Sequence, residues 1–80
     1  MTRIGSHAFG CAVRMLRARE RLTQKKLAAR ARIKAQHISD IELGRINPTL
    51  ATIESLADGL ALPASALLSE AERWCGASKR

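Results

Sequence analysis

Residues 23–43 constrain the fold of this 80-residue chain more than any other segment. Apolar residues recur there at helical spacing on both sides of a break near Arg32, namely at Leu27, Ala31, Ile33, Ile38 and Ile41. This period predicts two short helices, over residues 24–31 and 35–43, that bury their inner faces against each other. Ala28 places only a methyl group where the two helices could cross closely.

Three further helices are predicted around this pair. The first covers residues 9–20, with an apolar face of Phe9, Ala12, Val13 and Leu16. The next follows the turn at Asn47-Pro48, with Thr49 as its N-cap and an inner face of Leu50, Ile53, Leu56, Ala57 and Leu60. Pro63 can begin the last helix, over residues 64–73. With no strand pattern, repeat or linker, we expect a compact all-α domain of five helices over residues 1–80, with a flexible arm at about 1–7 and a frayed tail at about 75–80.

The predicted helix ends carry both favourable and unfavourable local signals. Thr23 is a good N-cap for the helix over residues 24–31, and Gly44 can end the next helix in a left-handed conformation. Arg32 stands where such a tight turn would favour glycine, so a positive φ there would cost about 1–2 kcal/mol. Lys34 is a poor N-cap, and Gly59 costs its helix about 1 kcal/mol relative to alanine.

The charge of +7 is unevenly distributed along the chain. Residues 1–45 contain eleven Lys/Arg and three Asp/Glu, whereas residues 46–80 contain three Lys/Arg and four Asp/Glu. A basic half joined to a nearly neutral half is typical of a surface that faces a polyanion. The alternative is a generally basic, solvated surface.

The outer face of the helix over residues 35–43 is polar and carries Gln36, His37 and Asp40. A short exposed helix of this kind can enter a DNA major groove. There Gln can bind adenine N6 and N7, His can donate to guanine, and Asp can accept from cytosine N4. In the alternative interpretation, Asp40 pairs with a nearby arginine and only Gln36 and His37 read sequence.

The helix over residues 24–31 begins with Gln24, Lys25 and Lys26. Cations at a helix N-terminus oppose the helix dipole, and an anion bound there would reverse that penalty. We therefore expect a phosphate contact at this helix start. The alternative is an imperfect but harmless surface.

Other classes of site find little support in the sequence. Cys11 and Cys75 are too few and too distant for a disulfide scaffold or zinc site, and the two histidines add no ligand spacing, so we expect free thiols and no metal or cofactor. No nucleophile or acid–base constellation indicates an enzyme. No membrane span or signal peptide is recognisable, and the chain is expected to be cytoplasmic.

Four strings together resemble the phage repressor/Cro class of helix-turn-helix regulators, also called the xenobiotic-response-element family. They are Val-Arg-Met-Leu-Arg at 13–17, Leu-Thr-Gln-Lys-Lys-Leu-Ala at 22–28, His-Ile-Ser-Asp-Ile-Glu-Leu-Gly-Arg at 37–45 and Asn-Pro-Thr-Leu-Ala-Thr-Ile at 47–53. The resemblance covers residues 13–68 and implies a lambda-repressor-like fold. It departs from the usual pattern at Arg32, Lys34, Leu43 and Ile46, the last two being apolar where polar residues are common.

The resemblance also implies residue roles. Base edges would be read by Ala35, Gln36, His37 and Asp40, and phosphate would be contacted by Thr23, Gln24, Arg45 and Asn47. Lys25, at the helix start described above, and Lys34 complete the expected phosphate contacts. Arg17 and Glu42 would form a structural ion pair.

The implied function is sequence-specific regulation of transcription by a homodimer. Regulators of this geometry place two helices about 34 Å apart on inverted repeats of double-stranded DNA. The candidate dimer interface is Leu60, Leu62, Ala66 and Trp74, unless these residues close the core of the monomer. Among compact regulators the chain resembles restriction–modification controllers, with a small phage repressor or an antitoxin that binds a toxin as alternatives. RNA binding is less favoured, because bases usually stack on exposed aromatic side chains and this chain has only Phe9 and Trp74.

Overall fold

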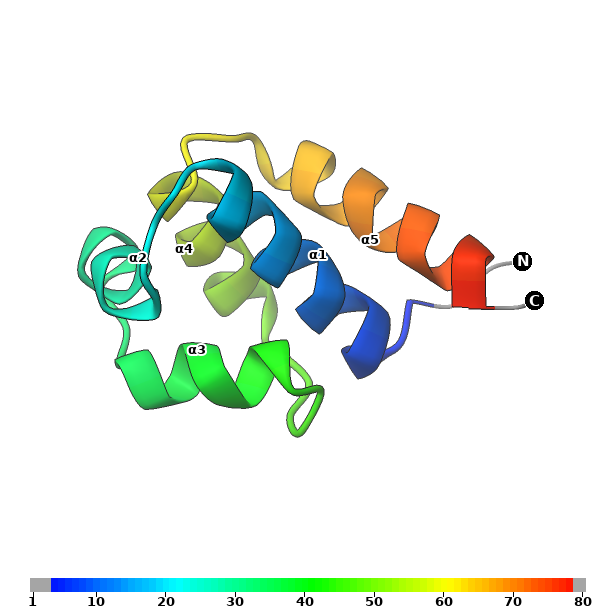
Figure 1. Cartoon of the computed structure of the whole chain (residues 1–80), viewed down its shortest axis with the longest axis horizontal. Helices are drawn as coiled ribbons and strands as arrows, with labels where there is room; N and C mark the ends of the chain where they lie inside the picture. Colours follow the sequence, from blue (N-terminus) through cyan, green and yellow to red (C-terminus); the bar gives the residue numbers. More distant parts are fainter. Residues whose placement is uncertain (1–3, 79–80) are drawn as a thin grey trace.

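The computed structural model describes the backbone of residues 4–78 and the side chains of residues 4–74. This part of the chain forms helices and turns without a strand, which confirms the all-α, five-helix fold (Figure 1). The helices are α1 (Ser6–Arg19), α2 (Gln24–Ala31), α3 (Ala35–Glu42), α4 (Leu50–Gly59) and α5 (Ala64–Ser78).

Helix α1 lies between α3 and α5 and packs against both (Figure 1). Helix α2 packs against α3 and α4, and α4 in turn contacts α5. All five helices contribute to one buried cluster, whose largest fully buried side chains are Val13, Leu27, Ile38, Ile41, Leu56 and Leu67. The predicted inner faces of α2 and α3 are therefore confirmed, and their opposite faces remain available at the surface.

Two helices extend further than predicted. Helix α1 begins at Ser6, with Gly5 as its extended N-cap, because Ala8 already belongs to the buried face. The predicted arm of residues 1–7 was thus too long, although residues 1–3 lie outside the described part. Helix α5 continues to Ser78 instead of ending near residue 73, since Ala71 and Trp74 continue its packing on the core. The frayed tail is therefore wrong for the backbone of residues 75–78, and residues 79–80 are not described.

The predicted inner face of α4 is correct except at Leu50. Leu56, Ala57 and Leu60 are buried, and Ile53 packs against the core. Leu50 is 69% exposed because it is the first residue of α4 and lies before the helix reaches the core.

Four helices end in residues with left-handed backbone conformation. The φ angles are 56° at Arg21, 59° at Arg32, 72° at Gly44 and 59° at Ala61. Only one of these four residues is a glycine. Arg32 adopts the positive φ whose cost was considered from the sequence, and Gly44 ends α3 as predicted. In each case the next backbone N–H bonds back to the preceding helix, as Arg45 N does to Asp40 O at 2.9 Å. These bonds satisfy helix-end carbonyls at a conformational cost that only glycine avoids.

Two glycines allow helices to approach closely. A Cβ at Gly59 would lie 3.0 Å from Leu27 Cδ1, so the residue that weakens α4 also lets it pack on α2. A Cβ at Gly10 would overlap the carbonyl oxygen of Ile41 and lie 2.8 Å from that of Glu42. Gly10 therefore sets the distance between α1 and the end of α3.

Candidate nucleic-acid interface

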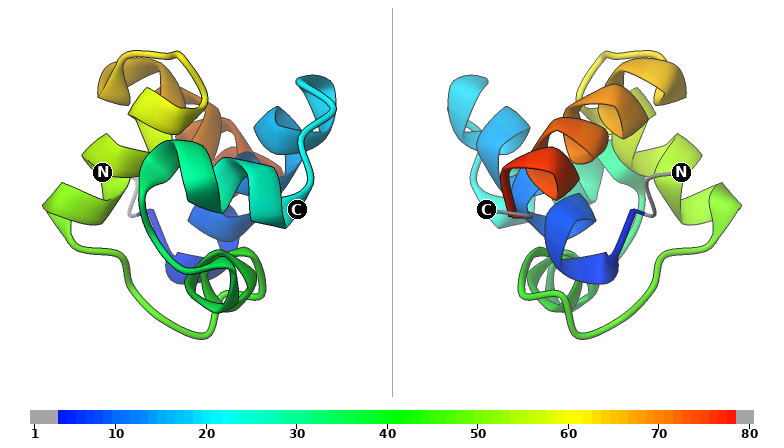
Figure 2. Two further views of the ribbon diagram at one scale, coloured as in Figure 1. Left: turned by 90° about the vertical axis from the view of Figure 1, so that its left-hand side faces the viewer. Right: turned by 90° about the vertical axis from the view of Figure 1, so that its right-hand side faces the viewer.

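Helix α3 presents a polar face at one edge of the molecule. Ile38 and Ile41 anchor it in the core. On the other side Gln36 is exposed, while His37 and Asp40 are half-buried. Ala35 is also half-buried, but it packs against the core. In Figure 1, α3 runs along the lower side of the molecule, and in Figure 2, where it is seen nearly end-on, no other helix lies below it. Three of the four residues predicted to read bases, Gln36, His37 and Asp40, thus lie on the polar face of one short helix, whereas Ala35 packs partly against the core.

Asp40 holds two partners in the described structure. The Gln36 side chain donates from Nε2 to Asp40 Oδ1 at 3.2 Å. The guanidinium Nη1 of Arg45 lies 3.6 Å from the same oxygen, in an ion pair whose side chains are 65% (Arg45) and 28% (Asp40) exposed. The arginine pairing of Asp40, which the sequence left as an alternative, is therefore present.

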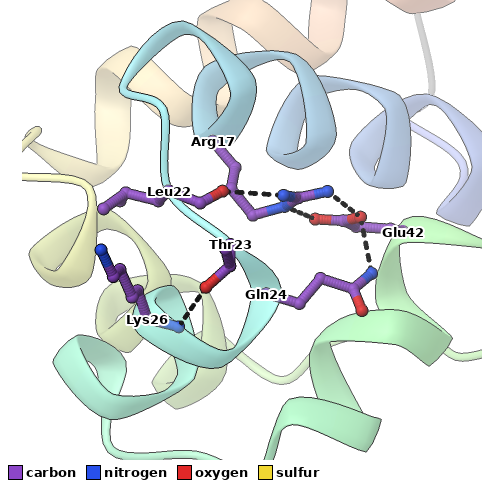
Figure 3. A network of polar contacts seen from close by, with 6 residues as sticks. All are labelled: Arg17, Leu22, Thr23, Gln24, Lys26 and Glu42. Carbon is purple, nitrogen blue, oxygen red and sulfur yellow. Dashed lines mark hydrogen bonds and ion pairs between the residues drawn. The ribbon is translucent and has the colours of Figure 1, made fainter.

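The ion pair expected between Arg17 and Glu42 is present and ties α1 to α3 (Figure 3). It is bidentate, with 2.6 Å from Arg17 Nε to Glu42 Oε2 and 3.1 Å from Nη2 to Oε1. Arg17 also donates from Nη1 to the Leu22 carbonyl at 2.8 Å. Only 17% of the Arg17 side chain and 5% of the Glu42 side chain are exposed. Because bidentate charged pairs have a fixed geometry, this pair orients α3 against the body of the domain.

Gln24 takes part in the same network. Its Nε2 donates to Glu42 Oε1 at 3.0 Å, so α1, α2 and α3 meet at one carboxylate (Figure 3). Sequence reasoning assigned Gln24 a phosphate contact and missed this structural bond, which joins residues 18 positions apart. Next to it, Thr23 caps α2 as predicted, accepting from Lys26 N at 3.0 Å.

Exposed polar and cationic side chains lie immediately before and after α3 and in the first turn of α2. Lys25 is in the first turn of α2, Lys34 is the N-cap of α3, and Arg45 follows the end of α3; all three are exposed. Lys34 makes no side-chain capping bond, in agreement with its poor capping ability. Asn47 is also exposed, and its Oδ1 accepts a hydrogen bond from Ser6 Oγ.

A family model described as a helix-turn-helix domain matches residues 8–78. The chain belongs to the helix-turn-helix domain family. The resemblance to the phage repressor/Cro class that was drawn from the sequence is thereby confirmed.

Relatives and solved structures refine the placement of this helix-turn-helix domain. It is similar to an immunity repressor protein of Bacillus phage phi105, at 36% identity over 61 residues that cover 76% of this chain and 42% of the repressor. The clp gene regulator ClgR from Corynebacterium glutamicum has a similar structure, with a TM-score of 0.87, 26% identity, and coverage of 92% of this chain and 79% of that one. The restriction-modification controller protein C.AhdI from Aeromonas hydrophila gives a TM-score of 0.75 and 29% identity, covering 78% of this chain and 94% of that one.

This helix-turn-helix domain spans less than half the length of the curated relatives that it matches. Among its described residues, no group of His, Cys, Asp and Glu could hold a metal ion. No helix in the described part is long and apolar enough to cross a membrane. Cys11 is a half-buried free thiol, and the side chain of Cys75 lies outside the described residues.

The predicted dimer residues of the helix-turn-helix domain divide into two groups. Leu60 is only 3% exposed and belongs to the core of the monomer, so its assignment to a dimer interface is wrong. Leu62 and Trp74 are half-buried against the core, and Ala66 is half-buried. In the described part of the chain the exposed large apolar residues are instead Leu43, at 57%, and Leu50. Ile46, one of the two apolar departures from the family pattern, packs against the core.

An apolar hollow lies between the start of α1, the α3–α4 loop, α4 and α5. It is lined mainly by Ile4, Phe9, Pro48, Ile53 and Leu68. Leu50 stands one turn before Ile53 on α4, where residues three apart are neighbours on a helix surface. Leu50 does not line the hollow itself, but it is exposed next to Ile53, which does.

Proposed function

We propose that this helix-turn-helix domain is a DNA-binding transcription regulator that inserts α3 into the major groove. The observation that carries the proposal is the exposed polar face of α3, anchored by a buried ion pair and flanked by exposed cations. Reading bases in the major groove needs a helix that protrudes and is not covered by neighbouring elements. Cations on both sides of such a helix can contact the phosphates. The proposed activity is binding, without catalysis, and the DNA partner implies a cytoplasmic location.

Residue roles follow from position and chemistry. Gln36 and His37, near the start of α3, would read base edges, and the small Ala35 would let the helix approach the bases. The phosphate contacts would come from the two ends of the helix pair: Thr23, Gln24, Lys25, Lys34, Arg45 and Asn47. Gln24 retains a second N–H on Nε2 for phosphate beside the one that it donates to Glu42.

We propose that two copies bind an inverted repeat through the apolar surface around Leu50 and Ile53. A leucine that is 69% exposed beside an apolar hollow favours burial against a second chain of the same kind. This surface adjoins the loop after α3, at the end of α3 opposite to Gln36. Dimerisation there would place the reading residues at the outer ends of the two half-sites.

Among small regulators, the restriction–modification controller type is the proposed class, supported by the structural similarity to C.AhdI over 94% of that chain. Its expected action is to bind paired inverted repeats, activating at low occupancy and repressing when a second dimer binds. The 36% identity with a phage immunity repressor favours a phage-type repressor as the second candidate. Neither the repressor nor the controller similarity points to a toxin partner.

The test begins by selecting bound fragments from the source genome and measuring their affinity by fluorescence anisotropy. We expect half-sites in inverted orientation, and a loss of about 1–3 kcal/mol on the selected duplex for Gln36→Ala or His37→Ala, with flattened sequence preference. Asp58→Ala is the matched control, since Asp58 is exposed at the far end of α4. If the His37 change weakened random and selected DNA equally, the assignment of base reading would be wrong.

Dimerisation needs a separate measurement. Leu50→Glu should shift the sedimentation of the free protein toward the monomer and weaken binding to a paired site more than to a half-site. A dimer unaffected by Leu50→Glu would place the interface elsewhere. A wild-type protein that stays monomeric on an inverted repeat would refute the proposed assembly.

A further inference from the structure

Asp40 lies on the proposed reading face, but its contacts are directed along the protein surface. We infer that Asp40 is a positioning residue that holds the Gln36 carboxamide in one orientation for base reading and does not itself contact a base. This inference rests on the proposed function and assigns Asp40 a different role from the one suggested by the family resemblance.

The geometry begins with the spacing of the two side chains. Gln36 and Asp40 are four residues apart on α3, so they are neighbours on the same helix surface. Gln36 Nε2 donates to Asp40 Oδ1 at 3.2 Å. Gln36 is exposed, whereas only 28% of the Asp40 side chain is exposed. The less exposed carboxylate of Asp40 therefore holds the more exposed amide of Gln36 through this hydrogen bond.

The hydrogen bond fixes which edge of the amide faces outward. Nε2 carries two N–H groups, and Asp40 uses one of them. When Asp40 takes the N–H that points away from Oε1, the other N–H and the Oε1 acceptor remain as an adjacent donor–acceptor pair. Adenine presents the matching pair in the major groove, an N7 acceptor and an N6 donor, whereas guanine presents two acceptors. An amide held in this way would favour adenine and oppose guanine, while an amide free to rotate would discriminate less.

Arg45 makes the position of Asp40 compatible with DNA. Its Nη1 lies 3.6 Å from the same Oδ1 that receives the Gln36 bond. A carboxylate without a counter-charge between two phosphate walls would repel them. The paired arginine offsets this charge, and it is itself 65% exposed.

The experiment compares base preference in four proteins, the wild type, Gln36→Ala, Asp40→Ala and Asp40→Asn, on the selected duplex substituted one base pair at a time. Gln36→Ala first identifies the base pair that Gln36 reads. Asp40→Ala should reduce adenine preference at that same pair by about tenfold. Asp40→Asn should retain most of the preference, because the asparagine carbonyl can still accept from Gln36. Asp58→Asn is the control for loss of one negative charge, and circular dichroism verifies that each variant is folded.

The possible results distinguish failure of the proposed function from failure of the inference about Asp40. If the wild type shows no base preference, both the proposed function and this inference fail. If Gln36→Ala removes the preference at one pair but Asp40→Ala leaves it intact, only the inference fails. Loss of preference at a different base pair in Asp40→Ala would indicate direct reading by Asp40 and would also overturn it. The double variant Gln36→Ala/Asp40→Ala should lose no more preference than Gln36→Ala alone.

Discussion

Removing the Glu42 carboxylate should destabilise the domain severely. Glu42→Leu deletes three hydrogen bonds, two from Arg17 and one from Gln24, and leaves a guanidinium that is only 17% exposed without its counter-charge. Breaking one side of a buried pair costs about 3–5 kcal/mol. Arg17 keeps its bond to the Leu22 carbonyl and some contact with solvent, so we expect about 3 kcal/mol.

This loss is large for a domain of this size, whose free energy of unfolding is expected at about 4–12 kcal/mol. The melting temperature, followed by circular dichroism at one fixed protein concentration, should fall by about 12–24 °C. The double variant Arg17→Met/Glu42→Leu should recover about 2 kcal/mol of that loss, because no buried charge remains unpaired. A Glu42→Leu cost below about 1 kcal/mol, or a double variant as unstable as the sum of the two single variants, would refute the reasoning.

Three further outcomes are expected. Ala61→Gly should raise the free energy of unfolding by about 1 kcal/mol, because Ala61 has a left-handed backbone conformation. Ala29→Gly, inside α2, should lower it by a similar amount. A loss of stability in both variants would contradict the role given to left-handed residues at the helix ends. Gly10→Ala should cost about 3 kcal/mol in urea unfolding, because the new methyl group meets the α3 backbone, and an unchanged midpoint would mean that the crossing is loose. Lys25→Ala should reduce the slope of log affinity against log salt by about 1 on every duplex, while Arg73→Ala on α5 should leave it unchanged; equal effects would place Lys25 outside the interface.

Local signals in the sequence were sufficient to predict most helix ends. Thr23 and Thr49 both accept the expected backbone bonds, and Gly44 has the expected left-handed conformation. These features depend on a few consecutive residues, so a single sequence contains the information. Ala61 was not predicted, because alanine gives no sign of a left-handed position.

Contacts between distant segments were predicted less well. The bond from Gln24 to Glu42 and the close approach at Gly10 depend on how three helices meet, which periodicity does not encode. Leu50 and Leu60 were assigned from the same apolar stripe, yet one is exposed and the other is in the core. Periodicity identifies the side of a helix, but the helix start and the neighbouring helices decide how much of that side is covered.

The absence of a side chain at Gly10 affects how substitutions could change the position of α3 in this domain. The depth to which α3 projects from the body is limited by two backbone carbonyls that touch α1 at this point. A larger residue at this position would tilt α3 or move it outward without changing any side chain on α3. Under the proposed function, the sequence preference of the domain could therefore change through a substitution at a position that does not itself contact DNA.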